Sequence, residues 1–103
     1  MTQILVELPA ELAELPPVER DALIRAGLYE ATRARRRELE ALLAQATAHL
    51  QHFEERYGRS FDRFEAELLP TLDSLQAHED YTDWFFWQSV RAEQEALLVK
   101  LQR

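Results

Sequence analysis

The chain has no cysteine, which excludes disulfide bonds and thiolate metal sites. It has only two glycines and four prolines among 103 residues, so few positions interrupt a helix. No apolar run approaches the roughly 18 residues of a membrane span, and the N-terminus lacks the basic and apolar regions of a signal peptide. We therefore expect one mostly α-helical domain, residues 1–103, that is cytoplasmic and has no contact with a membrane.

An excess of basic residues is also missing, since 12 lysines and arginines stand against 19 aspartates and glutamates. The resulting net charge of −7 disfavours a general nucleic-acid-binding protein, which needs a basic face for phosphates. Residues 1–19 hold four acids and no base, and residues 62–103 hold nine acids and four bases. The acidic C-terminal region suits a basic partner protein.

Residues 3–8, QILVEL, alternate in a way that predicts a short N-terminal β-strand, with Ile4 and Val6 on one face. The sequence contains no second strand, although the backbone groups of a strand need hydrogen-bond partners. We therefore predict a homodimer in which two copies pair their strands in a two-stranded ribbon.

One long central helix is predicted from Pro17 to Tyr57, about 60 Å long at about 1.5 Å per residue. In its second half, apolar residues recur at alternating spacings of four and three, as in a coiled coil. These residues are Leu39, Leu43, Ala46, Leu50, Phe53 and Tyr57. We interpret them, with Ile4 and Val6, as a dimer or helix seam, and residues 1–57 as a strand plus a dimerisation helix.

Residues 58–77 are interpreted as a short back-folded helix and a polar connector. Gly58 predicts the end of the long helix, because glycine accepts the left-handed conformation of a C-cap. Ser60 is a candidate N-cap for a helix with three apolar residues on one side, Phe61, Phe64 and Leu68. A final helix is predicted from about Tyr81 to Leu101. Its apolar stripe consists of Trp87, Val90, Leu97 and Leu101.

The stretch HEDYTDWFFWQSV, residues 78–90, holds five of the chain's ten aromatic residues. Consecutive residues of a helix step by about 100°, so neighbouring aromatics cannot all face one core. The acids of this stretch fit the first turn of a helix, where carboxylates are favourable. We predict that residues 78–103 bind a partner through Asp80, Tyr81, Asp83, Trp84, Phe85 and Trp87. The alternative interpretation places these aromatics in the protein's own core.

Residues that would indicate catalysis, a cofactor or a small-molecule substrate are not recognisable, so we do not expect an enzyme. His49 and His52 share a helix face, but two histidines alone do not define a metal site, and none is predicted. The run of Arg33, Arg35, Arg36 and Arg37 has two interpretations. These arginines form ion pairs with neighbouring glutamates, or they make weak contact with DNA.

The opening ILVELPAELAELP, followed by ERDALIRAGLYEA, resembles the starts of small bacterial antitoxins related to ribbon–helix–helix proteins. The segment FEERYGRSFDRFEAEL, followed by HEDYTDWFFWQSV, is similar to the later part of small prokaryotic antitoxins of type II toxin–antitoxin pairs. The similar stretches cover most of the chain. The resemblance implies an N-terminal dimerising unit and a C-terminal arm, residues 78–101, that occludes a toxin, commonly a ribonuclease.

Two departures from that pattern concern DNA binding. The predicted strand offers Leu5 and Glu7, where such repressors usually offer basic or polar side chains to DNA. Pro16 and Pro17 stand where a glycine turn is usual between the two helices. The leading hypothesis is therefore a non-catalytic antitoxin. Two alternatives stay open: a helical adaptor dimer with internal aromatics, and a DNA-binding autoregulator.

Overall fold

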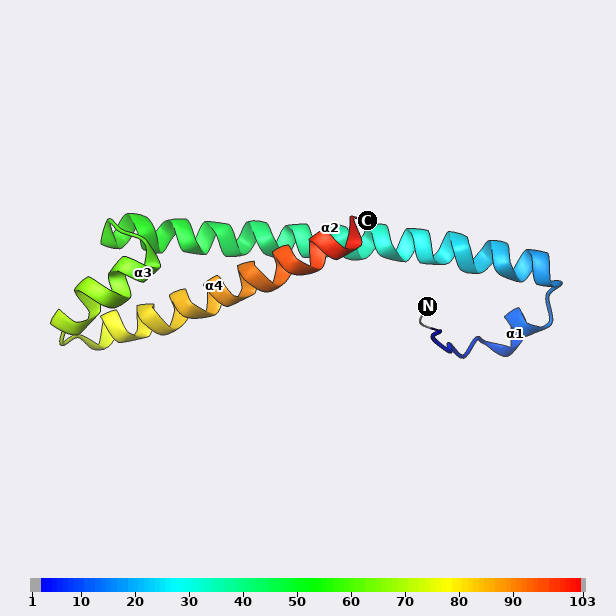
Figure 1. Ribbon diagram of the computed structural model, residues 1–103, viewed down its shortest axis with the longest axis horizontal. Helices are drawn as coiled ribbons and strands as arrows, with labels where there is room; N and C mark the ends of the chain where they lie inside the picture. The colour runs from blue at the N-terminus through cyan, green and yellow to red at the C-terminus, as the bar shows by residue number, and fades with distance from the viewer. Residues whose placement is uncertain (1–2, 103) are drawn as a thin grey trace. The chain divides into compact units, whose positions relative to one another are not determined.

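The computed structural model describes residues 3–102 and is mostly helical (Figure 1). The chain divides into two compact units, Met1–Ala34 and Arg35–Arg103, where the sequence predicts a single domain. The outermost residues of the predicted domain, 1–2 and 103, lie outside the described range. None of the helices within residues 3–102 combines the length and apolar character needed to span a bilayer. The helical elements are α1 (Ala10–Ala13), α2 (Pro17–Tyr57), α3 (Phe61–Arg63), the π-helical turn η1 (Phe64–Leu68), the 3-10 turn η2 (Leu69–Thr71) and α4 (Leu75–Leu101).

The long central helix is confirmed, because α2 extends from Pro17 to Tyr57. Gly58 follows it with φ of 65°, in the left-handed region that favours glycine. The Gly58 N–H donates to the carbonyl oxygen of Glu54 at 2.8 Å, which satisfies one of the last free carbonyls of the helix. Ser60 then caps α3, and its side chain accepts a hydrogen bond from the Arg63 N–H.

The predicted N-terminal strand does not form, and residues 3–102 contain no strand at all. Residues 3–8 lack regular structure, and the side chains of Ile4 and Val6 are 80% and 72% exposed. A strand is stable only when a second strand pairs with its backbone groups, and the described chain supplies none. Ile4 and Val6 are therefore not part of a strand in this chain, and the predicted ribbon between two copies stays a prediction.

The unit Met1–Ala34 contains α1 and the first part of α2. Helix α1 is a single turn with no side-chain cap, beginning where the Leu12 N–H donates to the carbonyl of Pro9 at 3.0 Å. Pro16 accepts the first hydrogen bond of α2, from the Arg20 N–H at 3.0 Å. No residue between 3 and 34 is buried. This unit therefore has no core of its own among its described residues.

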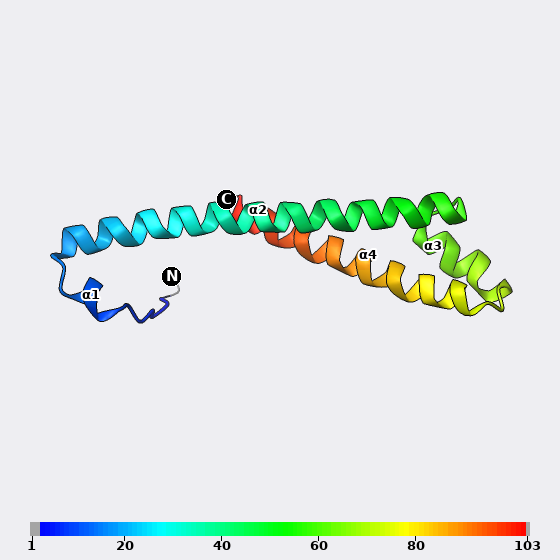
Figure 2. The same cartoon turned by 180° about the vertical axis from the view of Figure 1, so that it is seen from behind.

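The unit Arg35–Arg103 is an antiparallel helical hairpin, in which α4 returns along the C-terminal half of α2 (Figures 1 and 2). Contacts between the two helices keep a constant register. Tyr57 bonds Asp80 at one end and Arg36 bonds Leu101 at the other. Phe53 stacks on Trp84 between them, at 5.5 Å between ring centroids. The short elements α3, η1 and η2 connect the two helices.

The heptad seam of α2 is buried inside this hairpin. Leu39, Leu50 and Phe53 are 2%, 2% and 6% exposed, while Leu43 and Tyr57 are half-buried. The partner helix that the seam required is α4 of the same chain. The interpretation of this seam as a dimer interface is therefore replaced by packing within one chain, because α4 already covers its apolar side chains.

The core of the hairpin is aromatic and centres on Trp84, which is 0% exposed. Its buried members are Leu50, Phe53, Phe61, Phe64 and Trp84. Phe61 and Phe64 come from the connecting elements, so the short back-folded segment supplies part of the core. Offset and edge contacts between such rings add stabilisation beyond area burial, on the order of 0.5–1.5 kcal/mol per pair.

Helix α4 begins at Leu75, earlier than the predicted start near Tyr81. The Ser74 side chain accepts a hydrogen bond from the Ala77 N–H at 3.2 Å, which makes Ser74 the N-cap. Its first turn contains no acid, so the acidic residues of the 78–90 stretch lie further along the helix than predicted. The most buried positions of its second half are Gln94 and Leu98, beside the predicted stripe, whose four members are only half-buried.

Candidate functional site on the exposed face of α4

The solvent-facing side of the first turns of α4 carries apolar and acidic side chains together. Leu75 is 76% exposed, and Phe85 and Phe86 are each 55% exposed. Between them lie Glu79 and Asp83, both exposed. We call these residues the α4 surface: Leu75, Glu79, Asp83, Phe85 and Phe86.

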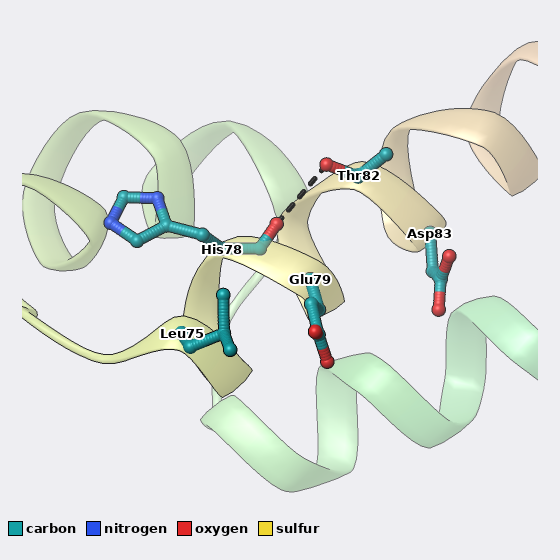
Figure 3. Close-up of a pocket in the computed structure, with 5 residues that line it drawn as sticks. All are labelled: Leu75, His78, Glu79, Thr82 and Asp83. Carbon is teal, nitrogen blue, oxygen red and sulfur yellow. Dashed lines mark hydrogen bonds between the residues drawn. The ribbon is translucent and has the colours of Figure 1, made fainter.

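Helical spacing explains why Leu75, Glu79, Asp83 and Phe86 share a surface. Phe85 lies at the edge of this surface, about 200° around the helix from Asp83, and its ring centroid is 6.2 Å from that of Phe61. Residues three or four positions apart on a helix stand above one another, and Leu75, Glu79 and Asp83 follow that spacing. With His78 and Thr82 they line a shallow cavity of about 460 Å³ (Figure 3). Figure 3 shows the carboxylates of Glu79 and Asp83 on the same side of the helix. The Thr82 hydroxyl donates a hydrogen bond to the carbonyl of His78, in the same helix, at 3.1 Å.

The composition of the α4 surface suits binding rather than catalysis. No serine or other nucleophile stands next to a base within it, and its carboxylates are exposed. From Leu75 to Val90 the helix contains three acids and no lysine or arginine. This surface therefore combines exposed apolar side chains with exposed carboxylates.

The two tryptophans predicted to bind a partner lie elsewhere. Trp84 is in the core, where its ring stacks on Phe53 at 5.5 Å and on Tyr57 at 5.9 Å. Trp87 is half-buried and stacks on His49, with ring centroids 4.0 Å apart and an interplanar angle of 9°. Both tryptophans therefore face α2, and their rings hold the hairpin together.

Asp80, also predicted to bind a partner, is 4% exposed. Its carboxylate accepts hydrogen bonds from the Tyr57 hydroxyl and from Gln76 Nε2 at 2.9 Å. Arg56 Nη1 lies 3.2 Å from Asp80 Oδ2. Burial, the hydrogen bond to Asp80 and the negative charge of Asp80 together raise the pKa of Tyr57 to about 12. Asp80 thus fastens the start of α4 to the end of α2.

Tyr81 is half-buried, and its ring stacks on Phe61 at 5.5 Å. Its hydroxyl donates to Glu65 Oε2 in η1, and this hydrogen bond raises the pKa of Tyr81. Of the six residues predicted to bind a partner, Asp83 and Phe85 are the ones on the exposed side of α4.

The sequence interpretation missed Leu75, Glu79 and Phe86 as members of the α4 surface. The signal that identifies them is Ser74, a preferred N-cap residue four positions after Pro70. Within this helix Trp84 and Phe86 differ in direction by about 200°, so the packing of Trp84 on α2 leaves Phe86 on the outer side.

The four arginines of the basic run have different surroundings. Arg35 forms an ion pair with Glu38 at 2.9 Å, and the Arg33 guanidinium lies 5.8 Å from the centre of the Tyr29 ring. Arg36 Nη2 donates to the carbonyl of Leu101 at 2.7 Å, where a cation interacts favourably with the C-terminus of α4. Arg37 is exposed. Three of the four arginines, Arg33, Arg35 and Arg36, therefore have local partners, and the predicted contact with DNA stays a prediction.

Metal-binding clusters of three or more histidine, cysteine, aspartate or glutamate side chains are absent from residues 3–102. His49 stacks on Trp87, and His52 meets the edge of Phe53 at 5.6 Å. Both histidines therefore contact aromatic rings at the side of the hairpin core.

Comparison of the chain with protein-family models, with curated proteins and with solved structures gave no match. The similarity to antitoxins therefore rests on the sequence pattern alone.

Proposed function

We propose that this chain is a non-catalytic, antitoxin-like protein that binds a basic partner protein, a toxin, through the α4 surface. The observation that supports the proposal most is the exposure of Phe85 and Phe86 beside Glu79 and Asp83 on a helix whose opposite side is fixed by a core. A helix held in this way presents its outer side chains without needing to fold first, so little conformational entropy is lost on binding.

The negative charge of the α4 surface indicates that the proposed partner is a basic protein. The carboxylates of Glu79 and Asp83 are unscreened by any lysine or arginine before Arg91 along the helix. Such a surface steers a basic protein toward it, and the exposed rings then supply apolar contact area. A ribonuclease toxin has a basic groove for RNA phosphates, so it fits this description.

The anchors proposed here differ from those first predicted. Trp84, Trp87 and Tyr81 make contacts inside the hairpin, so the proposed anchors are Phe85, which the sequence already predicted, and Phe86. Asp83 keeps its proposed role, and Glu79 joins it, while Asp80 is occupied by Tyr57, Gln76 and Arg56.

The test uses the full chain as bait in extracts of its native host. Beside the wild type, one bait carries Phe85→Ser and Phe86→Ser, and a control carries Val99→Ser. Val99 is 53% exposed on the same helix, so the control removes a similar exposed apolar group away from the α4 surface. We expect the wild type and the control to capture a small basic protein that the double variant does not retain.

Two further measurements connect capture to function. Raising the salt concentration should weaken capture, because contacts between exposed charges are screened. If the captured protein cleaves RNA, adding the wild-type chain in equal amounts should stop cleavage, and the double variant should not. Capture by all three baits alike would contradict the proposed surface, and capture of no basic protein would contradict the function.

A helical adaptor with internal aromatics is the second candidate, and the complete burial of Trp84 favours it. It predicts that the double variant at Phe85 and Phe86 changes no interaction. The DNA-binding alternative through Arg33 to Arg37 stays a prediction; a salt-dependent shift of promoter DNA would test it.

A further inference from the structure

The unit Met1–Ala34 leaves an entirely apolar groove open to solvent. Its lining consists of residues without any polar side chain, and its volume is about 740 Å³. The segment before α2 supplies one wall and the first turns of α2 supply the other, with Ile4, Leu5, Val6, Leu8 and Leu12 facing Leu23, Ile24, Gly27 and Leu28. Leu5 is 100% exposed and Leu28 is 64% exposed.

A unit of this kind needs a partner in order to bury apolar surface. Chains below about 40 residues are usually stabilised by disulfides, metals or oligomerisation. The sequence has no cysteine, and residues 3–102 hold no cluster of metal-binding side chains. A contiguous exposed apolar surface of this kind is typical of a surface that binds another chain.

We propose that the groove is occupied by α2 of a second copy, so that two chains pair antiparallel through residues 17–34. The charge of this segment supports the pairing. Residues 17–34 contain three acids and three bases, whereas the whole chain has a net charge of −7. The two paired helical segments therefore do not repel each other through net charge, and the acids of residues 4–12, Glu7 and Glu11, do not line the groove.

The groove also contains a position suited to close helix contact. A Cβ built on Gly27 meets no atom within 4 Å, so nothing within the described chain requires glycine there. Glycine inside a helix is unfavourable relative to alanine by roughly 0.5–1 kcal/mol. A two-fold axis between Ile24 and Gly27 places Ile24 of each copy over Gly27 of the other. The absence of a side chain there lets the two helices approach closely.

The same axis sets Leu23 of one copy opposite Leu28 of the other. Both are exposed in the single chain, at 50% and 64%. The apolar wall formed by residues 4–12 then covers the flank of the incoming helix. This contact is distinct from the seam of α2 that α4 already covers and from the α4 surface, so it is independent of the proposed function.

The experiment measures the mass of the full chain by sedimentation equilibrium across a range of protein concentrations. Three proteins are compared: the wild type, Gly27→Gln and Ala22→Gln. Ala22 is exposed and lies on the opposite face of the same helical segment, so it receives the same new side chain outside the groove. Circular dichroism of each protein checks that helix content is retained.

We expect the wild type and Ala22→Gln to form dimers with equal dissociation constants. The glutamine at position 27 occupies the space that Ile24 of the second copy needs, so its dissociation constant should rise about tenfold or more. A wild type that stays monomeric at every concentration would overturn the proposal. So would equal dimerisation of all three proteins, since that would place the interface elsewhere.

Discussion

The two units of this chain use similar apolar side chains and reach opposite results. In the hairpin Arg35–Arg103, the apolar residues of α2 are covered by α4 and by the short elements between them, and Leu50 is 2% exposed. In Met1–Ala34 the same helix carries Leu28, which is 64% exposed. The difference lies in what the chain places opposite each stretch, because a helix buries an apolar face only when another element packs on it.

The same contrast occurs within α4, between its inner and outer sides. Trp84 and Phe86 are two positions apart, yet the first is 0% exposed and the second is 55% exposed. The inner side gives stability, and the outer side is available for a partner. Substitutions that separate these contributions test the comparison directly.

The largest effect should follow Trp84→Ala. Its ring fills the centre of the aromatic core, so truncation removes its contacts and leaves a cavity, which should cost about 3–5 kcal/mol of unfolding free energy. Denaturant unfolding followed by circular dichroism measures this. Phe86→Ala is the control and should change stability by less than about 1 kcal/mol. Equal losses in the two variants would show that the inner and outer sides do not differ.

Replacing Asp80 by alanine should have the next largest effect. The Tyr57 hydroxyl and the Gln76 amide lose their acceptor in a partly buried place, which should cost about 2 kcal/mol. The denaturant midpoint gives the change. Asp83→Ala is the matched control, because Asp83 is exposed on the same helix and makes no hydrogen bond or ion pair with α2 among the described residues. If Asp80→Ala left the denaturant midpoint unchanged, this carboxylate would not be holding α4 to α2.

Much of the helical architecture followed from local signals in the sequence. The limits of α2 came from Pro17 and Gly58, whose backbone preferences act within one or two residues. The seam of Leu39 to Tyr57 came from its spacing, which states that a helix packs there. The spacing does not indicate which chain supplies the second helix. The sequence alone therefore does not identify α4 as the helix that covers this seam.

The candidate site was harder to predict because it depends on which side of α4 packs on α2. Helical spacing gives the relative directions of the side chains but not the side that packs on α2. In the structure, α4 begins at Leu75, and Asp80 and Trp84 contact Tyr57 and Phe53. The predicted strand failed for a different reason. Alternation in residues 3–8 describes side chains, whereas a strand requires a second backbone.

Gly58→Ala should have an intermediate effect of about 1 kcal/mol. Its φ of 65° is strained for any residue with a Cβ, even though a Cβ there meets no atom within 4 Å. Thermal unfolding of the variant reports the loss. Because Gly58 ends α2 before the hairpin connection, an unchanged melting temperature would indicate that the hairpin does not need this left-handed turn.

Alkaline pH should reveal the burial of the Tyr57 hydroxyl together with its hydrogen bond to Asp80. The pKa of Tyr57 is raised from 10.0 in the unfolded chain to about 12 in the fold. The folded state therefore keeps a proton that the unfolded state loses, and this contribution to stability is present below pH 10 and is lost between pH 10 and about 12. Comparing the pH dependence of unfolding in wild type and Tyr57→Phe isolates it. Parallel curves would contradict the raised pKa.

The smallest effect on the single chain should come from Leu28→Ala, measured against Leu50→Ala. The two substitutions remove the same atoms from the same helix. Leu50→Ala should cost about 2–5 kcal/mol because it opens a cavity in the core. Leu28→Ala should cost less than about 0.5 kcal/mol, since its side chain is mostly exposed. Unfolding is measured at low protein concentration, where any dimer has dissociated. If the loss of unfolding free energy in Leu28→Ala grows with protein concentration, the Leu28 side chain contacts a second copy. If Leu28→Ala and Leu50→Ala cost the same at low concentration, the two units do not differ in burial.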